Sequence, residues 1–316
     1  MSEATAQQPR YSAIVLLEDQ DSDLVPLVDT LNRVLTSRPA GHEIIIVANG
    51  VGGFLRRALA SVPLCNGVLK AYEFPTKVSQ SVCLKAGFEE SSGEIILVCG
   101  SHRQITEPSL MRLIDSLDEQ TDIVNAWRTK RNDSSFNQIQ SRVFNSLVRK
   151  IAHCQLHDLS SAVKVYRRSV LEQTDFYGNM HRFLPIIAEA KGFKTKEVEC
   201  EHYRWRGKTG PCTPYEYIER LADLLTIYFL IGFKSKPLRF FNLVGAFFLL
   251  LGFGCLSYIF LDKMFFGHPI GGRPLLLLSL FSMMLGVQVS SVGLLGEIIA
   301  FAHGRHKRQY SIEKII

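Results

Sequence analysis

The sequence predicts an α/β fold, a doubly wound and mainly parallel sheet, followed by a pair of membrane-spanning helices. Short apolar runs alternate with segments of helical periodicity over residues 11–129, and this alternation favours a parallel sheet. Two uncharged apolar runs, Phe240 to Leu261 and Pro274 to Gly296, follow each other near the end of the 316-residue chain. Each run is long enough to cross a bilayer as a helix, which takes about 20 residues.

The expected strands share a short apolar run bounded by polar or turn residues. In chain order they are residues 12–17, 43–47, 67–74, 94–98, 121–127, 163–166 and 197–202. The expected helices carry apolar residues three or four positions apart, and they are residues 24–35, 55–60, 78–88, 108–117, 138–151 and 183–191. Such sheets bind ligands beyond the carboxyl ends of their strands. We therefore expect the site in the loops that start at Glu18, Ala48, Gly100 and Arg128.

The chain divides into five expected parts. Residues 1–10 are polar and lack an apolar core, so we expect a disordered tail and no signal peptide. The α/β domain covers residues 11–212. Residues 213–236 form an amphipathic helix that is suited to the membrane interface, although packing on the soluble domain explains the same pattern. The two-span hairpin occupies residues 237–302, and residues 303–316 form a tail.

Charge and cysteine content indicate where in the cell the protein is expected. The net charge is +6, from 36 basic and 30 acidic residues. This mild excess fits a protein that faces an anionic membrane surface better than a dedicated nucleic-acid binder. An ordinary solvated surface explains it equally well. Seven scattered cysteines without a CxxC pair indicate reduced thiols in the cytosol. Basic residues gather beside the apolar runs, at Lys234, Lys236, Arg239, Arg305, Lys307 and Arg308. By the positive-inside rule, the soluble domain and both termini are cytoplasmic.

Several local motifs follow one another in a fixed order before the hairpin. They are Asp122 to Arg128 (DIVNAWR), Ser141 to Asn145 (SRVFN), Asp158 to Arg168 (DLSSAVKVYRR), His181 to Pro185 (HRFLP), the basic loop with His202, Arg204, Gly207 and Thr209, and Gly293 to Glu297 (GLLGE). Together they resemble the family 2 glycosyltransferases of GT-A fold, in the membrane-anchored polyprenyl-phosphate branch that includes dolichol-phosphate-mannose synthases. The resemblance covers the chain from about Tyr11 to its end.

The resemblance implies transfer of a sugar from a nucleotide diphosphate to a lipid phosphate on the cytoplasmic face. The donor and diphosphate pocket would then contain Glu18, Ala48, Asn49, Gly100, His102, Arg103, Gln104 and Arg128. The acceptor or lipid-phosphate side would contain Asp158, Ser161, Lys164, His181, Arg182, His202 and Arg204. Basic residues suit both roles, because they neutralise phosphate charge and arginine does so with two parallel hydrogen bonds. At Lys164 the family more often has arginine.

The chain departs from the family pattern on the donor side. Residues 48–51 (ANGV) stand where the family has two aspartates and Gly-Ser. In place of the Asp-x-Asp metal motif, one alignment puts Gly100 and His102, and another puts Ser101 and Arg103. Neither pair can hold Mg²⁺ or Mn²⁺ well, because these hard cations prefer carboxylate oxygens. We therefore expect no metal cofactor.

Two features could compensate for the missing carboxylates. Arg103 could place a fixed positive charge at the diphosphate in place of a cation, and the acidic segment 18–21 (EDQD) could supply carboxylates. His102 could be a single metal ligand, but a lone histidine more often packs or hydrogen-bonds, and the acidic segment is more often a solvated loop. No metal site is expected in either case.

Two functions remain open. The first is an active transferase without a bound metal, in which Arg103, Arg128 and Arg204 neutralise the diphosphate. The second is a catalytically inactive pseudoenzyme that binds lipid phosphate or scaffolds a membrane glycan or lipid pathway. The donor motifs are altered while the acceptor motifs persist, which fits a lipid-phosphate binder. An ion channel is disfavoured, because two uncharged spans offer no polar path.

The expected partners are a polyprenyl phosphate and a nucleotide sugar, with no nucleic acid. Glycines in the two spans permit close approach of helices, and so permit a homo-oligomer or a partner membrane protein. These residues are Gly245, Gly252, Gly254, Gly286 and Gly293.

Overall fold

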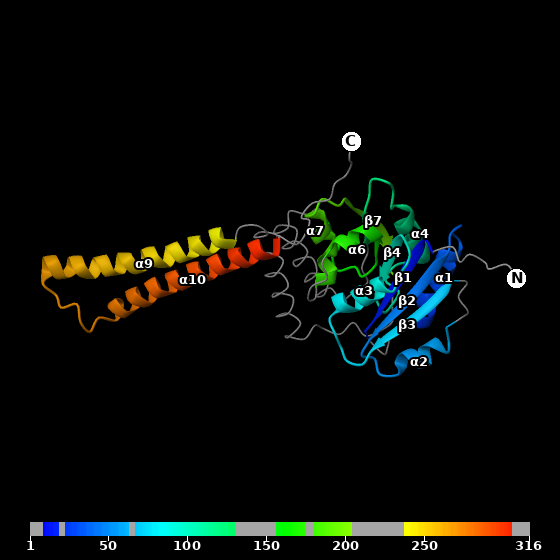
Figure 1. Ribbon diagram of the computed structural model, residues 1–316, viewed down its shortest axis with the longest axis horizontal. Helices are drawn as coiled ribbons and strands as arrows, with labels where there is room; N and C mark the ends of the chain where they lie inside the picture. The colour runs from blue at the N-terminus through cyan, green and yellow to red at the C-terminus, as the bar shows by residue number, and fades with distance from the viewer. Residues whose placement is uncertain are drawn as a thin grey trace. The chain divides into compact units, whose positions relative to one another are not determined.

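The computed structural model describes residues 9–18, 23–62, 67–129, 156–174, 180–203 and 237–304 (Figure 1). These residues belong to two compact units, an N-terminal α/β unit and a C-terminal pair of helices. The helices expected over residues 138–151 and 213–236 lie outside the described residues, as do Arg204 and most of both tails.

The N-terminal unit alternates strands and helices along the chain. Its elements are β1 (Tyr11–Leu17), α1 (Leu24–Thr36), β2 (His42–Asn49), α2 (Phe54–Leu59), β3 (Val68–Phe74), α3 (Gln80–Glu89), β4 (Ile95–Cys99), α4 (Glu107–Asp115), β5 (Ile123–Thr129), β6 (Lys164–Arg167), α6 (Arg168–Gln173), the 3₁₀ turn η1 (Met180–Phe183), α7 (Leu184–Glu189) and β7 (Thr195–Glu201). The expected strands are confirmed with small shifts of their ends. Helix α3 begins later than expected, because the Ser79 side chain caps it by accepting the Val82 N–H.

The sheet has the strand order β3-β2-β1-β4-β6-β5-β7. Only β6 runs antiparallel to its neighbours β4 and β5 among the described strands, so the expectation of a mainly parallel sheet is confirmed. The chain moves from β1 through β2 to β3 on one side and places β4 on the other. This reversal lies between β1 and β4, so their carboxyl ends bring Glu18 and Gly100 to one crevice.

Both faces of the sheet are covered, which explains why the central strands β1, β2 and β4 are buried along their whole length rather than at alternate residues (Figure 1). Ala13, Val15 and Leu17 of β1 pack in a core shared with α1 and α4. Ile14 and Leu16 point the other way, into a second core built with α3, α6 and α7. These two layers hold the carboxyl ends of the strands in place and leave the loops beyond them to form a site.

A buried carboxylate ties the opposite, amino-terminal end of the sheet together. Glu43 of β2 is 1% exposed and accepts hydrogen bonds from the Ser12 hydroxyl at 2.7 Å and the Ser92 backbone N–H at 2.6 Å. Its other oxygen pairs with Lys70 Nζ at 2.9 Å. Burial alone would raise the pKa of Glu43, but the hydrogen bonds from Ser92, Ser12 and Lys70 outweigh it and lower the pKa.

Replacing Glu43 with alanine is expected to lower the free energy of unfolding by about 3 kcal/mol, because it removes the buried acceptor of Ser12 and Ser92 and the ion-pair partner of Lys70. Urea unfolding of the purified protein measures this loss. The matched control is Glu89→Ala, which removes an exposed ion pair with Lys85 and should change stability by less than about 1 kcal/mol. Since the folded pKa of Glu43 is lowered, its contribution should disappear as the pH falls below 4.5, the ordinary value. Equal effects of both substitutions would contradict this role.

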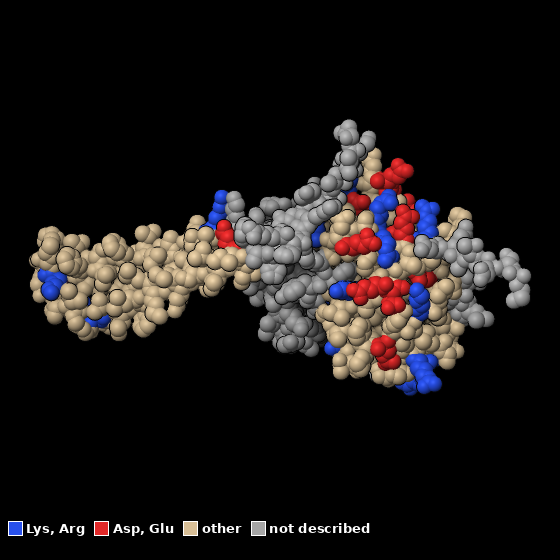
Figure 2. Space-filling model, in the orientation of Figure 1, with Lys and Arg blue, Asp and Glu red and all other residues tan. Residues whose placement is uncertain are grey.

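The C-terminal unit is an antiparallel pair of helices, α9 (Pro237–Phe266) and α10 (Pro274–Gly304). Both contain a stretch long and apolar enough to cross a membrane, Leu238–Phe266 and Pro274–Ile299. Large apolar side chains cover most of the outer surface of the pair, and Figure 2 shows charged residues on it only toward the two ends. Asp262, near the end of α9, pairs with Arg273 of the connecting turn at 2.6 Å.

The glycines of the two spans pack α9 against α10 within one chain. A Cβ on Gly245 would lie 2.8 Å from the Gly286 carbonyl oxygen, and one on Gly252 would lie 2.6 Å from an atom of Met283. Gly293 likewise abuts Phe241. Of the five glycines Gly245, Gly252, Gly254, Gly286 and Gly293, Gly254 is the one whose Cβ would have no atom within 4 Å. Self-association through these glycines stays a prediction, but most of them already serve the contact between the two helices.

Candidate functional site

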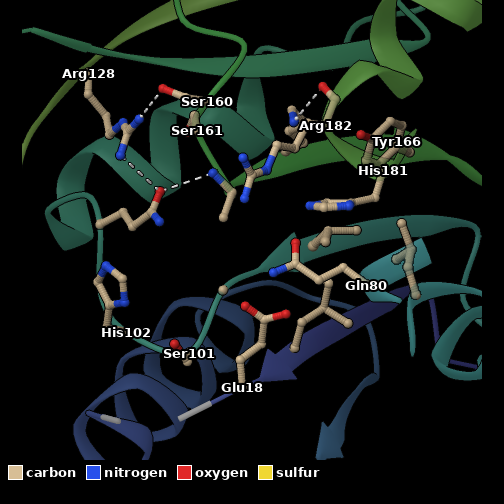
Figure 3. A pocket seen from close by; sticks show the side chains of 17 residues that line it. Glu18, Gln80, Ser101, His102, Arg128, Ser160, Ser161, Tyr166, His181 and Arg182 are labelled. Atoms are coloured by element: carbon tan, nitrogen blue, oxygen red, sulfur yellow. Dashed lines mark hydrogen bonds between the residues drawn. The ribbon is translucent and has the colours of Figure 1, made fainter. Parts of the chain in front are cut away.

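A cavity of about 330 Å³ opens beyond the carboxyl ends of β1 and β4 (Figure 3). It is lined by Leu16, Glu18, Gln80, Leu84, Val98, Gly100, Ser101, His102, Gln104, Arg128, Ser160, Ser161, Ala162, Lys164, Tyr166, His181 and Arg182. It therefore lies at the crevice expected from the strand order. Figure 3 shows Arg128, His181 and Arg182 on one side of it, and Glu18 and Ser101 on the other.

The cavity brings together residues from both expected sets. From the donor set it gathers Glu18, Gly100, His102, Gln104 and Arg128, and from the acceptor set Ser161, Lys164, His181 and Arg182. Five other expected residues are described but do not line it: Ala48, Asn49, Arg103, Asp158 and His202. Donor-side and acceptor-side residues thus share a single cavity.

Two of the residues outside the lining have clear structural roles. The Asn49 side chain accepts the Val78 N–H at 2.7 Å and donates to the Val78 carbonyl at 2.9 Å, which fastens the end of β2 to the segment before α3. Arg103 forms an ion pair with Asp23 at 2.8 Å and donates to the Tyr203 hydroxyl at 2.9 Å. Its charge is compensated by Asp23, which does not favour Arg103 as a substitute for a metal ion.

Arg128, at the end of β5, belongs to a buried ion pair. Its Nε and Nη2 atoms donate to the two carboxylate oxygens of Asp158 at 2.8 and 3.1 Å. Nη2 also donates to the Ser160 hydroxyl at 2.9 Å. The side chains of Arg128 and Asp158 are only 7% and 4% exposed, so each needs the other's charge. Arg128 therefore presents a fixed donor to the cavity without a net positive charge.

A second carboxylate positions the segment that carries Asp158. Glu197 of β7 accepts the backbone N–H groups of His157 at 2.7 Å and Asp158 at 3.0 Å. It also accepts the side-chain amide of Asn125 at 2.9 Å. The Asp158 carboxylate is thus held from behind, and Arg128 in turn is held by it.

Lys164 is the charged group that this network does not neutralise by direct contact. It is 3% exposed, and its Nζ lies 3.5 Å from the Leu159 carbonyl oxygen and 3.3 Å from that of Arg182. Its side chain has no salt bridge with any described residue. Burial lowers the pKa of Lys164 to about 7; the nearby Asp158 charge opposes the shift, while Arg182 and Arg128 add to it. An anion entering the cavity would favour the ammonium form.

His181 and Arg182 stand beside Lys164 on the same wall. The Nδ1 atom of His181 is buried and has no hydrogen-bond partner within the described segments. Burial, with the charges of Arg182 and Lys164, lowers the pKa of His181 well below its ordinary value, so its ring is neutral. Arg182 is exposed at the rim of the cavity. Together the three residues offer several donors to one anionic group.

The lining fits a divalent cation poorly. Among the described residues Glu18 is its only carboxylate, and no group of three His, Cys, Asp or Glu residues in these ranges could hold a metal ion. The backbone at Gly100 is also crowded, because a Cβ there would lie 3.1 Å from that of Ala162. The residues present therefore suit an anion rather than a hard cation.

Sequence reasoning missed several polar lining residues, among them Gln80, Ser101 and Ser160. Ser101 and Ser160 lie inside segments that the motifs had singled out, so attention to every polar residue of those segments would have found them. Gln80 gives no such signal, because it reaches the cavity from the first turn of α3.

Comparisons with known proteins show similarity to glycosyl transferases. Residues 24–175 match the profile described as Glycosyl transferase family 2. The chain is 26% identical over 309 residues to the dodecaprenyl-phosphate galacturonate synthase of Rhizobium johnstonii, across 95% of this chain and 90% of that protein. It is 25% identical over 313 residues to the undecaprenyl-phosphate 4-deoxy-4-formamido-L-arabinose transferase of Yersinia pestis, across 97% and 94%.

Solved structures extend the likeness to the fold. The glucosyl-3-phosphoglycerate synthase of Mycobacterium tuberculosis superposes with a TM-score of 0.53 at 14% identity, covering 71% of this chain and 81% of that one. The same enzyme in complex with uridine diphosphate gives a TM-score of 0.51. At this identity the likeness shows the fold alone, and it confirms the expected GT-A-like architecture.

Proposed function

This chain contains a glycosyl transferase family 2 domain, and on this premise we propose that it is a membrane-anchored polyprenyl-phosphate glycosyltransferase. The lipid phosphate binds at the basic wall of Lys164, His181 and Arg182, and a nucleotide sugar occupies the side of Glu18 and His102. The observation that carries the proposal is Lys164. Its buried amine contacts two carbonyl oxygens and lines an open cavity, so a bound anion would supply the charge it lacks.

The proposed reaction is a single displacement at the anomeric carbon of the sugar. A phosphate oxygen of the lipid forms the new carbon–oxygen bond, while the bond to the diphosphate oxygen breaks and the nucleoside diphosphate leaves with the electron pair. The attacking oxygen is already ionised, so no general base has to remove a proton. Lys164 and Arg182 align the phosphate, which accelerates the reaction by orientation. Arg128 adds a hydrogen-bond donor rather than net charge.

A second candidate, a lipid-phosphate-binding protein without transferase activity, is favoured by one observation. Two of the three arginines expected to neutralise the leaving diphosphate, Arg103 and Arg128, are already paired with Asp23 and Asp158, and the third, Arg204, lies outside the described residues. Less positive charge then remains to neutralise the nucleoside diphosphate that leaves the donor. Both candidates bind the lipid phosphate through the same wall and differ in what happens to a donor.

The membrane arrangement is part of the same proposal. Helices α9 and α10 are long and apolar enough to span the bilayer, and the basic residues that flank the two apolar runs support a cytoplasmic location of the soluble domain and both termini. The lipid phosphate, at the bilayer surface, then comes within reach of a domain anchored beside it.

Thermal unfolding of the purified full-length protein with undecaprenyl phosphate tests the binding step. We expect the lipid to raise the melting temperature, whereas undecaprenol, which has the same chain without phosphate, should not. Equal shifts with both lipids would contradict a phosphate site. Mass spectrometry after incubation with undecaprenyl phosphate and a panel of nucleoside diphosphate sugars then separates the two candidates. A sugar-phosphate lipid shows a transferase; binding without any product favours the inactive relative.

A further inference from the structure

One wall of the cavity carries a carboxylate without a counter-charge. Glu18 directly follows the last residue of β1, is partly buried, and lines the cavity. Its side chain forms no hydrogen bond or salt bridge with any residue in the described ranges. Its negative charge is felt nearby, because burial and, to a smaller extent, the charge of Glu18 raise the pKa of the Cys83 thiol to about 11. Glu18 therefore presents an unpaired carboxylate to a ligand.

The opposite wall carries the complementary charge. Figure 3 shows Glu18 and Ser101 across the cavity from His181 and Arg182, with the carboxylate of Glu18 turned toward the open space. The buried Lys164 amine belongs to the same basic wall as Arg182. A ligand that fills the cavity thus meets cationic groups at one end and a carboxylate at the other. It should carry an anion at its first end, and hydrogen-bond donors or a positive charge at its second.

Three other roles of Glu18 fit this cavity less well. A carboxylate repels a phosphate, so Glu18 is not suited to hold the lipid phosphate or the leaving diphosphate. A single carboxylate in the described part of the lining offers too few ligands for a divalent cation. The displacement proposed above needs no general base, because the attacking phosphate oxygen is already ionised. Accepting hydrogen bonds from hydroxyl or amino groups is the role that remains.

The sugar ring is the part of the donor that brings such groups to Glu18. Because the displacement occurs at the anomeric carbon, the ring lies next to the lipid phosphate, and so next to the wall of Lys164 and Arg182. Gln80 and Ser101 also line the cavity, and their amide and hydroxyl groups can bond to further ring hydroxyls without adding charge.

We propose that Glu18 selects the transferred sugar by its charge, so that the site takes a sugar that is neutral or carries an amino group and excludes a sugar that carries a carboxylate. The selection has an attractive and a repulsive part, since the same carboxylate accepts from hydroxyl or ammonium groups and opposes a like charge. The proposal rests on the proposed function in one respect, namely that sugar and phosphate share this cavity.

Hexose 1-phosphates test the selection without any assumption about the nucleotide, because each joins a phosphate directly to a sugar ring. The melting temperature of the purified full-length protein is followed during titration with glucose 1-phosphate, glucosamine 1-phosphate and glucuronic acid 1-phosphate. The first two should stabilise the protein, and the third should bind at least about tenfold more weakly. Equal binding of glucuronic acid 1-phosphate, or no stabilisation by any of the three, would overturn the proposal.

Glu18→Gln assigns the selection to this residue, because glutamine keeps the size and the acceptor oxygen and removes the charge. In this variant glucuronic acid 1-phosphate should gain about tenfold in affinity, while glucosamine 1-phosphate should lose affinity. The matched control is Glu89→Gln, at an exposed position of α3 outside the cavity lining, which should keep the original ranking. An unchanged ranking in Glu18→Gln would refute its role. Binding of undecaprenyl phosphate by the unmodified protein is measured in parallel, so a failure of the lipid site is distinguished from a failure of the sugar selection.

Discussion

Replacing Lys164 with methionine should weaken the binding of undecaprenyl phosphate by roughly 10- to 100-fold at pH 6.5. Methionine fills a similar volume but removes a charge-assisted hydrogen bond to the phosphate. Titration of the lipid into the purified protein, followed by melting temperature or by intrinsic fluorescence, measures the change. The matched control is Lys85→Met on α3, an exposed lysine whose pair with Glu89 lies outside the cavity lining. An affinity unchanged by Lys164→Met would remove this residue from the site.

The pH dependence of the same binding follows from the environment of Lys164. With a pKa of about 7 in the free protein, its amine loses the proton above neutrality, so affinity should fall from pH 7 to 9 by up to about tenfold per unit. The lipid phosphate keeps its full charge over this range, since its second pKa is about 6. Lys164→Arg should bind with little dependence on pH, because the guanidinium stays charged. A flat profile in the unmodified protein would contradict an amine-based site.

The stability of the ligand-free protein should change with pH in the opposite direction to the affinity for the lipid. In the unfolded chain Lys164 keeps its ordinary pKa of 10.5, so between pH 7 and 10.5 the unfolded state binds more protons than the folded state. The ligand-free protein should therefore gain stability as the pH rises through this window. In Lys164→Met that gain should be absent, which separates the effect of this amine from other titrating groups.

Replacing Asp158 with alanine should lower the free energy of unfolding by about 3–5 kcal/mol. The substitution leaves the buried Arg128 guanidinium without its compensating charge, and the penalty of an unpaired buried ion dominates the loss. Urea unfolding of the full-length protein measures it. The double variant Asp158→Ala with Arg128→Met should recover part of the stability, because it removes the orphaned charge as well.

The same variant also reports on the cavity. Arg128 lines it, so inorganic pyrophosphate should stabilise Asp158→Ala more than the unmodified protein by binding to the freed guanidinium. Normal stability of Asp158→Ala, or equal stabilisation of both proteins by pyrophosphate, would show that the pair matters less than its burial indicates.

Much of the fold could be predicted because the central strands are buried on both faces and contain continuous apolar runs. Residues 43–47 (EIIIV) and 94–98 (EIILV) mark β2 and β4 in this way. Helix α6 (Arg168–Gln173) was missed, because six residues are too few to show a helical period. The antiparallel direction of β6 gave no signal either, since a strand's direction depends on its connection rather than on its own side chains.

The position of the candidate site could be predicted from the sequence, but the pairing and burial of its charged residues could not. The loops after β1 and β4 were expected to meet, and Glu18 and Gly100 do line one cavity. The pairing of Arg103 with Asp23, eighty residues apart, is set by tertiary packing and cannot be read from sequence spacing. The burial of Lys164 belongs to the same class, because it depends on β6 lying between β4 and β5.

The close contact between Gly100 and Ala162 constrains how this pocket could change over evolution. An aspartate at position 100 would push its first side-chain carbon against the methyl group of Ala162, so the two would have to move apart by a few tenths of an ångström. A route toward cation-dependent chemistry therefore passes through position 162 as well, where glycine would make the room. An aspartate at position 100 alone would depend on whether Ala162 can make that shift.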